Sequence, residues 1–142
     1  MRPLALAPGA RHRIERHVRA TAPEEACGIL LGREEDEGPR RVLEARPTRN
    51  GAEDRRRRYV LEPADLAAAV REARERSLDL LGYYHSHPAG GGEPSVTDRA
   101  HAWPEVSYLI VALDGFGKLE VRSWRLAGDG FVEEPVRWPE TE

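Results

Sequence analysis

Residues 85–98, HSHPAGGGEPSVTD, carry side chains whose types and spacing suit a metal site. His85 and His87 are two positions apart, so on an extended strand both imidazoles lie on one face and can reach the same point. The three glycines that follow let the chain turn back, and a helix starting at Ser95 would present Asp98 to that point. Two histidines and one carboxylate leave the fourth tetrahedral position of zinc open, which is typical of a catalytic site and not of a structural one.

Each of these residues also has a simpler interpretation. Two histidines beside a proline can end a strand, Ser95 can be a plain helix cap, and Asp98 is an acid of the kind common near a helix N-terminus. The combination of H-x-H-P, a glycine spacer and S-x-x-D has few degrees of freedom, so we favour the metal site. The other histidines lack such neighbours. His12 and His17 fall on a polar helix face where we expect solvent, and His101 could at most support a ligand.

Hydrolysis at such a metal also needs a group that takes a proton from water and passes it to a leaving amine. A glutamate can do both, and the stretch PEEACGILLG places Glu24 and Glu25 at the start of a buried strand. Either one could equally be a solvated loop acid. Adjacent strand residues point to opposite faces, so only one of them can face the metal, and spacing alone does not choose between them.

The elements that must position these residues follow from hydrophobic periodicity. Pro8 begins a first predicted helix that Pro23 ends, Pro63 begins a second helix, and a short third one should follow Ser95. Strands are predicted at 26–32, 41–46, 57–62, 78–85, 107–113 and 118–126. This order predicts a fold of the α/β (α+β) class, with a mixed β-sheet flanked by helices.

Length and composition limit the class of protein. The chain has 142 residues, of which 39% are hydrophobic, and this suits a single domain over residues 1–142. Cys27 is its only cysteine, which excludes an internal disulfide and a multi-cysteine zinc site. No apolar run approaches the roughly 20 residues that span a bilayer, and no secretory signal is visible, so we expect a cytoplasmic protein without a membrane partner. The net charge of −3 argues against nucleic acid as a partner.

The stretches E-x-C-G-I-L-L-G, G-Y-Y-H-S-H-P and P-S-V-T-D resemble the JAMM (MPN+, Mov34/MPN/PAD-1) zinc metalloproteases, in particular the short stand-alone prokaryotic type. The likeness extends over nearly the whole chain and implies the MPN/JAB (cytidine-deaminase-like) fold. It implies that His85, His87 and Asp98 are the ligands of Zn²⁺. It also selects Glu25 as the general acid/base and Ser95 as the donor to the oxyanion, with Ser95 able to cap the helix as well.

The same resemblance implies a substrate class. The short prokaryotic members act on ubiquitin-like sulfur-carrier proteins, cutting after the C-terminal Gly-Gly to expose it, to detach a conjugate or to release a carried amino acid. There are two alternatives. A non-catalytic MPN scaffold that binds partners would lack one or more of the zinc ligands. A zinc hydrolase of a small amide would have a closed pocket in place of an open groove. The run Arg55–Arg58 is either a docking patch for an acidic carrier or a solvated strand edge. The oligomeric state stays open, with a homodimer as one candidate.

Overall fold

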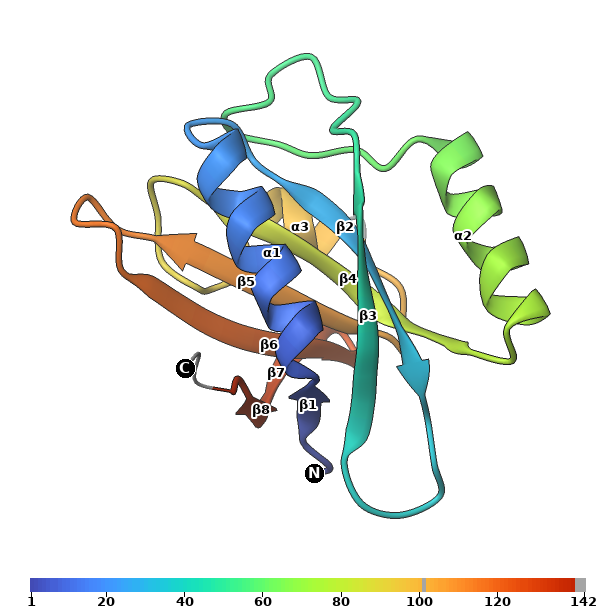
Figure 1. Cartoon of the computed structure of the whole chain (residues 1–142). Helices are drawn as coiled ribbons and strands as arrows, with labels where there is room; N and C mark the ends of the chain where they lie inside the picture. Colours follow the sequence, from blue (N-terminus) through green and yellow to red (C-terminus); the bar gives the residue numbers. More distant parts are fainter. Residues whose placement is uncertain (101, 140–142) are drawn as a thin grey trace.

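Residues 1–100 and 102–139, which a computed structural model of the chain describes, contain eight strands joined in one mixed sheet (Figure 1). In chain order the elements are β1 (Leu4–Leu6), α1 (Pro8–Thr21), β2 (Cys27–Arg33), β3 (Arg40–Thr48), α2 (Pro63–Glu75), β4 (Asp79–His87), α3 (Val96–Ala100), β5 (Ser107–Leu113), β6 (Leu119–Ala127), β7 (Gly130–Glu134) and β8 (Val136–Arg137). The strands lie in the order β7-β6-β5-β4-β2-β3-β1-β8. The pairs β1–β3, β1–β8 and β4–β5 are parallel and the others antiparallel. No helix within these residues is both long and apolar enough to cross a membrane.

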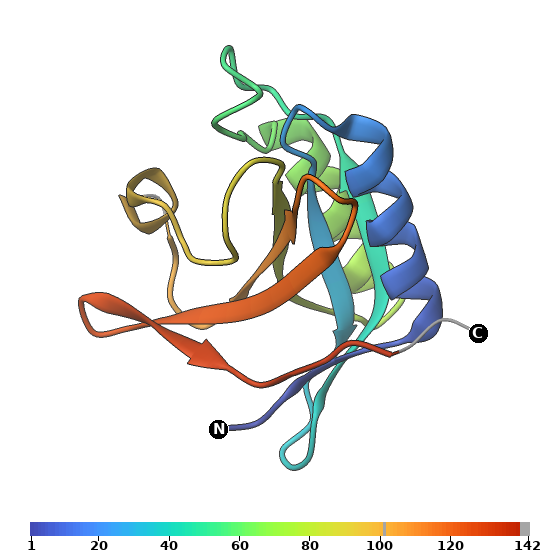
Figure 2. The ribbon, with the colours of Figure 1, turned by 90° about the vertical axis from the view of Figure 1, so that its left-hand side faces the viewer.

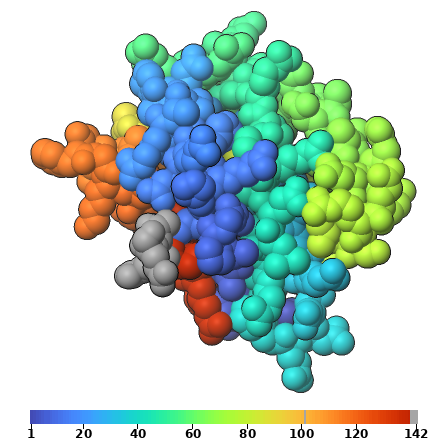
Figure 3. Space-filling view, in the orientation of Figure 1, coloured from blue at the N-terminus to red at the C-terminus, as the bar shows by residue number. Residues whose placement is uncertain are grey.

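The central strand β2 is buried on both faces, which separates the interior into two cores. Alternate residues point to opposite sides, so Leu30 belongs to one core and Leu31 to the other. The Leu30 side is covered by α1, whose Ile14 is fully buried, and the Leu31 side is covered by α2 through Ala69. Figure 3 shows α1 and β3 filling the middle of the surface on the first side. In Figure 2, α1 and α3 lie on opposite sides of the sheet. The site must therefore be assembled on the side away from α1.

The sheet curls so that its two edges meet at one corner, because Pro135 alone separates β7 from β8 (Figure 2). A buried polar network stabilises this corner. Arg40 is 1% exposed, donates to Ser107 Oγ at 2.6 Å, and has its Nη1 atom 3.6 Å from Glu134 Oε2. Glu134 also accepts a hydrogen bond from the Ser123 hydroxyl at 2.7 Å. The network links β3 with the β5–β7 end of the sheet.

The predicted mixed sheet flanked by helices is confirmed, but the strand predicted at 57–62 is wrong. These residues lie in a loop whose pairing is limited, within the described chain, to a single bridge between Asn50 and Leu61. The Asn50 side chain holds the backbone of this loop in place of a neighbouring strand, because it donates to the Arg58 carbonyl and accepts the N–H of Val60. The run Arg55–Arg58 is accordingly an exposed turn and not a strand edge. Periodicity does not reveal β1 and β8, which have three and two residues, or the short strand β7.

Candidate metal centre

The end of β4 carries two histidines on the side of the sheet away from α1. His85 is 1% exposed and lies opposite Cys27 of β2. Ser86, between the histidines, instead accepts the N–H of Ala26 on its hydroxyl at 2.8 Å and donates its own N–H to the Ala26 carbonyl at 3.0 Å. These bonds keep β4 extended as far as His87, so the Nε2 atoms of the two histidines come within 3.1 Å of each other.

A loop and a short helix bring Asp98 to the histidines. Ser95 donates its N–H to Asp98 Oδ2 at 2.8 Å, and its hydroxyl accepts the N–H of Asp98 at 3.0 Å. This reciprocal pair closes the first turn of α3 and directs the carboxylate. Asp98 Oδ2 lies 3.2 Å from Nε2 of His85 and 3.2 Å from Nε2 of His87. The sequence spacing alone could not give these distances.

The three converging atoms form a triangle that fits a small metal cation. Ligand atoms about 2.0 Å from a tetrahedral zinc ion lie about 3.3 Å from one another. Nδ1 of His87 is 2.7 Å from the Gly91 carbonyl, which can only accept, so Nδ1 carries the proton and Nε2 of the neutral ring offers a lone pair. That lone pair faces the Asp98 carboxylate, and a cation between these two acceptors removes their repulsion. The donor set therefore fits a metal ion.

When a histidine is protonated, its Nε2–H can donate to Asp98, so a proton competes with a cation for the same position, and the pKa shifts describe this protonation. Burial lowers the pKa of His85. Burial also opposes protonation of His87, but its hydrogen bonds to Asp98 and Gly91 outweigh this and raise its pKa. Burial would raise the pKa of Asp98, yet the hydrogen bonds from His85 and His87 hold it well below its usual range. Asp98 is thus an anion at neutral pH, as a metal ligand must be.

Glu25 approaches the histidines from a different segment, just before β2. Its N–H donates to the Arg55 carbonyl at 2.6 Å, and its own carbonyl accepts from Asn50 Nδ2 at 3.0 Å. One carboxylate oxygen of Glu25 and one nitrogen from each of His85 and His87 all lie within 4.8 Å of one another. The residue is 5% exposed, and burial raises the pKa of Glu25 to about 7, although nearby His87 lowers it. A carboxyl group with a pKa near neutrality can both take up and release a proton.

Two residues of the loop before α2 support the site although the sequence did not single out their roles. Tyr59 stacks on His85, with ring centroids 4.3 Å apart and planes at 21°. Nδ1 of His85 is buried without a hydrogen-bond partner among the described residues, so stacking orients this ring. Asn50, besides holding Glu25, donates to the Arg58 carbonyl at 2.8 Å and accepts the N–H of Val60 at 3.1 Å. The turn pair Asn-Gly was a visible signal, but it does not say what Asn50 contacts.

The glycine loop between the histidines and Asp98 is anchored on β6. Trp124 donates its Nε1–H to the Gly92 carbonyl at 2.9 Å, and the adjacent Gly91 carbonyl accepts from His87. A Cβ atom at Gly92 would lie 2.9 Å from the side chain of Arg122, so glycine lets the loop lie flat against the strand. The carbonyls of Gly91 and Gly92 are consecutive, so the strand β6 that holds one of them also helps to fix the orientation of the His87 ring.

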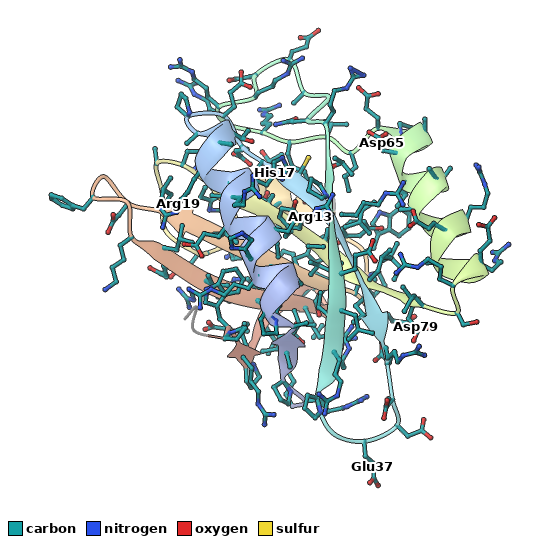
Figure 4. The ribbon with its side chains drawn as sticks, in the orientation of Figure 1. Arg13, His17, Arg19, Glu37, Asp65 and Asp79 are labelled. Atoms are coloured by element: carbon teal, nitrogen blue, oxygen red, sulfur yellow. The ribbon has the colours of Figure 1, made fainter. Side chains whose placement is uncertain are left out.

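The prediction that His17 is solvated is wrong. The side chain of His17 on α1 is labelled in Figure 4. Its Nδ1 atom lies 2.7 Å from the hydroxyl of Tyr84, and burial lowers the pKa of His17. The ring of Tyr84 fills the space next to Gly28, where a Cβ atom would come within 2.2 Å of it. Because glycine leaves this room, Tyr84 reaches α1 and covers part of its polar face.

The other residues considered from the sequence lie outside the cluster. Glu24 lines a separate cavity of about 430 Å³, which His17 also lines. The two adjacent glutamates therefore lie in different environments, with Glu25 at the cluster and Glu24 in this cavity. Cys27 is fully buried with its Sγ 3.4 Å from the Thr48 hydroxyl, and burial raises the pKa of its thiol, which suits a packing role. His101 lies outside the described residues.

The curled mixed sheet defines a JAB-like α+β domain, and the cluster on one of its faces is a group of residues that could hold a metal ion. Residues 8–127 match the family described as prokaryotic homologs of the JAB domain, and the chain belongs to this family. It is 38% identical over 138 residues to the Desampylase of Haloferax volcanii, covering 94% of each chain. It is 32% identical over 121 residues to the CysO-cysteine peptidase of Mycobacterium tuberculosis, covering 84% of this chain and 80% of the relative.

The fold is shared with a solved structure as well. The solution structure of a protein from Desulfitobacterium hafniense superposes with a TM-score of 0.84 at 30% identity, covering 94% of this chain and 90% of that one. The family and fold predicted from the sequence motifs are confirmed by these matches. The named relatives are hydrolytic enzymes, and the chain is an enzyme of the JAMM type.

Proposed function

We propose that this protein is a zinc-dependent peptidase and isopeptidase that cleaves after the C-terminal Gly-Gly of a ubiquitin-like or sulfur-carrier protein. The observation that carries the proposal is the convergence of two histidine Nε2 atoms and Asp98 Oδ2 within 3.2 Å, beside the buried carboxyl of Glu25. Similarity to a Desampylase and to a CysO-cysteine peptidase supports this substrate class.

The residues divide the work between holding the metal and moving protons. His85, His87 and Asp98 would hold zinc, which when bound supplies a Lewis acid for the scissile carbonyl and lowers the pKa of water to about 7. Glu25 takes up the proton of the attacking water and delivers it to the leaving nitrogen. The Ser95 hydroxyl donates to the developing oxyanion. It can do so while its oxygen accepts the N–H of Asp98, because a hydroxyl both accepts and donates.

The surroundings of the cluster favour a protein tail over the two alternatives. The three proposed ligands are all present and brought together, which a non-catalytic scaffold would not require. Beside the cluster lies a cavity whose wall residues Val60 and Trp103 are 50% and 71% exposed, so it opens to the surface and would not enclose a small amide. Glycine at the scissile bond lets an extended backbone approach the metal without side-chain clashes.

The test is to incubate the purified, zinc-loaded protein with carrier proteins that end in Gly-Gly plus a short extension, and to measure their intact masses. We expect products that end at Gly-Gly. Glu25→Gln keeps the shape of the side chain but should lose about 10²- to 10⁴-fold in rate, whereas the matched control Glu24→Gln should cleave like the parent. A zinc-loaded Glu25→Gln protein that cleaves at the parent rate would refute the assigned role.

A cytoplasmic location and a homodimer stay predictions. Cell fractionation and light scattering of the purified protein would test them.

A further inference from the structure

A polar cavity of about 430 Å³ lies between the end of α1, the end of β3 and the loop that leads to α2, and no step of the proposed chemistry uses it. These segments meet at the top of the molecule in Figure 1. We call it the charged cavity, and its main wall residues are His17, Thr21, Glu24, Arg49, Arg55 and Glu62. A cavity of this size holds a small molecule together with several waters.

The walls of the charged cavity carry two side chains of each charge. Arg49 and Arg55 are cations, while Glu24 and Glu62 are anions. Arg49 Nη2 and Glu62 Oε2 lie 4.0 Å apart, which is too far for a hydrogen bond, so both groups can still bind a ligand. Burial lowers the pKa of His17, which leaves its ring neutral at pH 7. The charges of the walls therefore balance.

This balance favours a ligand that carries both charges. A lone anion would be attracted by the two arginines and repelled by the two glutamates, and a lone cation would meet the reverse. A free α-amino acid has its carboxylate and its ammonium group on the same carbon atom, so it can bind a cation and an anion of the walls at once. The Thr21 hydroxyl and the His17 ring leave polar surface for its side chain.

The charged cavity is joined to the backbone of Glu25 on both sides. Glu24 precedes Glu25 in the chain. The N–H of Glu25 donates to the Arg55 carbonyl at 2.6 Å, and its carbonyl accepts from Asn50, another wall residue, at 3.0 Å. A molecule bound to both Glu24 and Arg55 would therefore tie together the two segments that position the proposed general acid/base.

We propose that the charged cavity binds a free α-amino acid, and that the bound amino acid raises the rate of cleavage by fixing the position of Glu25. Its carboxylate binds the arginines and its ammonium group binds the glutamates. The effect on the rate rests on the proposed function, whereas the binding does not. The rate of cleavage then depends on the supply of free amino acid.

Isothermal titration calorimetry on the zinc-loaded protein measures the binding with three matched molecules. L-Alanine carries both charges, propionate lacks the ammonium group, and ethylamine lacks the carboxylate. L-Alanine should bind at least about tenfold more tightly than either of the others, and L-serine should bind at least as tightly as L-alanine. Equal binding of the three molecules, or no binding of either amino acid at concentrations up to about 20 mM, overturns the inference.

Variants of the walls test where the amino acid binds. Glu24→Gln and Arg55→Gln each remove one charge and should weaken the binding of L-serine by about tenfold or more. Arg49→Gln, at a side chain that is 81% exposed and contributes little to folding, should weaken it by about threefold or more. Arg56→Gln is the matched control and should keep the parent affinity, because Arg56 is exposed in the same turn and does not line the cavity. Binding at parent strength in a folded Glu24→Gln or Arg55→Gln protein would come from the zinc ion or another surface, and overturns the inference.

Cleavage of a Gly-Gly carrier with and without L-serine tests the effect on the rate. Saturating L-serine should raise kcat of the parent by about fivefold with KM unchanged, and should leave the rate of the Glu24→Gln protein as it was. If L-serine binds and kcat of the parent stays the same, the regulatory role is overturned. If the parent cleaves no carrier although binding depends on Glu24 and Arg55, the binding site stands and the proposed function fails. If the parent cleaves but binds no amino acid, the proposed function stands and this inference fails.

Discussion

Replacing Trp124 by phenylalanine removes one hydrogen-bond donor from the glycine loop while leaving an aromatic ring on β6. The Nε1–H of Trp124 lies 2.9 Å from the Gly92 carbonyl, and the neighbouring Gly91 carbonyl fixes the proton of His87 on Nδ1. A hydrogen bond of this kind contributes a net of about 0.5–1.5 kcal/mol. If the loop must be in place for His87 to bind zinc, that loss weakens zinc affinity by about twofold to tenfold.

The assay is a competition titration of zinc between the protein and a chromogenic chelator at neutral pH. Trp138→Phe is the matched control, because Trp138 packs against the α1 core and lies 5.2 Å from the Arg11 guanidinium, away from the glycine loop. We expect the control to keep the parent affinity even if both variants melt at lower temperature. An unchanged zinc affinity in a folded Trp124→Phe protein would refute the idea that β6 positions His87.

Three further predictions concern Ser95, Glu134 and Glu25. Ser95→Ala should lower kcat by roughly 10²-fold or more if the hydroxyl stabilises the oxyanion, whereas a helix cap alone would cost about 1 kcal/mol of stability and leave kcat near normal. Glu134→Ala removes the buried one of the two carboxylates beside Arg40 and leaves Glu34 at 3.1 Å, so it should lower the free energy of unfolding by about 1–3 kcal/mol in urea titrations, while Glu133→Ala, at an exposed ion pair, should cost at most about 1 kcal/mol. In the zinc-free protein the pKa of Glu25 is raised from 4.5 to about 7, so burying its anion destabilises the fold fully above about pH 7 and not at all below about pH 4.5. Glu25→Gln should therefore stabilise the zinc-free protein at pH 8, by roughly 3 kcal/mol at most, and not at pH 4; equal effects at both would contradict the shift.

The elements that carry strong periodicity could be predicted from the sequence, and the short or unpaired ones could not. Helix α1 and strands β2, β4 and β5 have apolar patterns long enough to identify. β1 pairs with β3 and β8 pairs with β1, and these contacts between distant segments form only when the whole sheet curls. The segment 57–62 alternates like a strand, but the Asn50 side chain bonds the backbone of Arg58 and Val60, a contact between distant positions of the loop that no local pattern reveals.

In the candidate site, too, features set by neighbouring residues could be predicted, and contacts between distant segments could not. The two-residue spacing of His85 and His87 and the capping pattern from Ser95 to Asp98 are local, so the sequence indicated where these side chains would point. Tyr59 and Trp124 reach the site from segments distant in sequence, and no local pattern connects them to it. His17 was misjudged for the same reason, because its partner Tyr84 lies 67 positions away.

The central claim is tested most directly by the intact mass of a carrier protein ending in Gly-Gly plus a short extension, incubated with one preparation of the enzyme in three states. These are the zinc-loaded protein, the same protein after removal of zinc by a chelator, and the protein after zinc is returned. We expect a product ending at Gly-Gly in the first and third states and none in the second, with the His87→Ala protein inactive even when zinc is added. Cleavage that persists after chelation, or a folded, zinc-loaded protein that leaves every such carrier intact, would contradict the account.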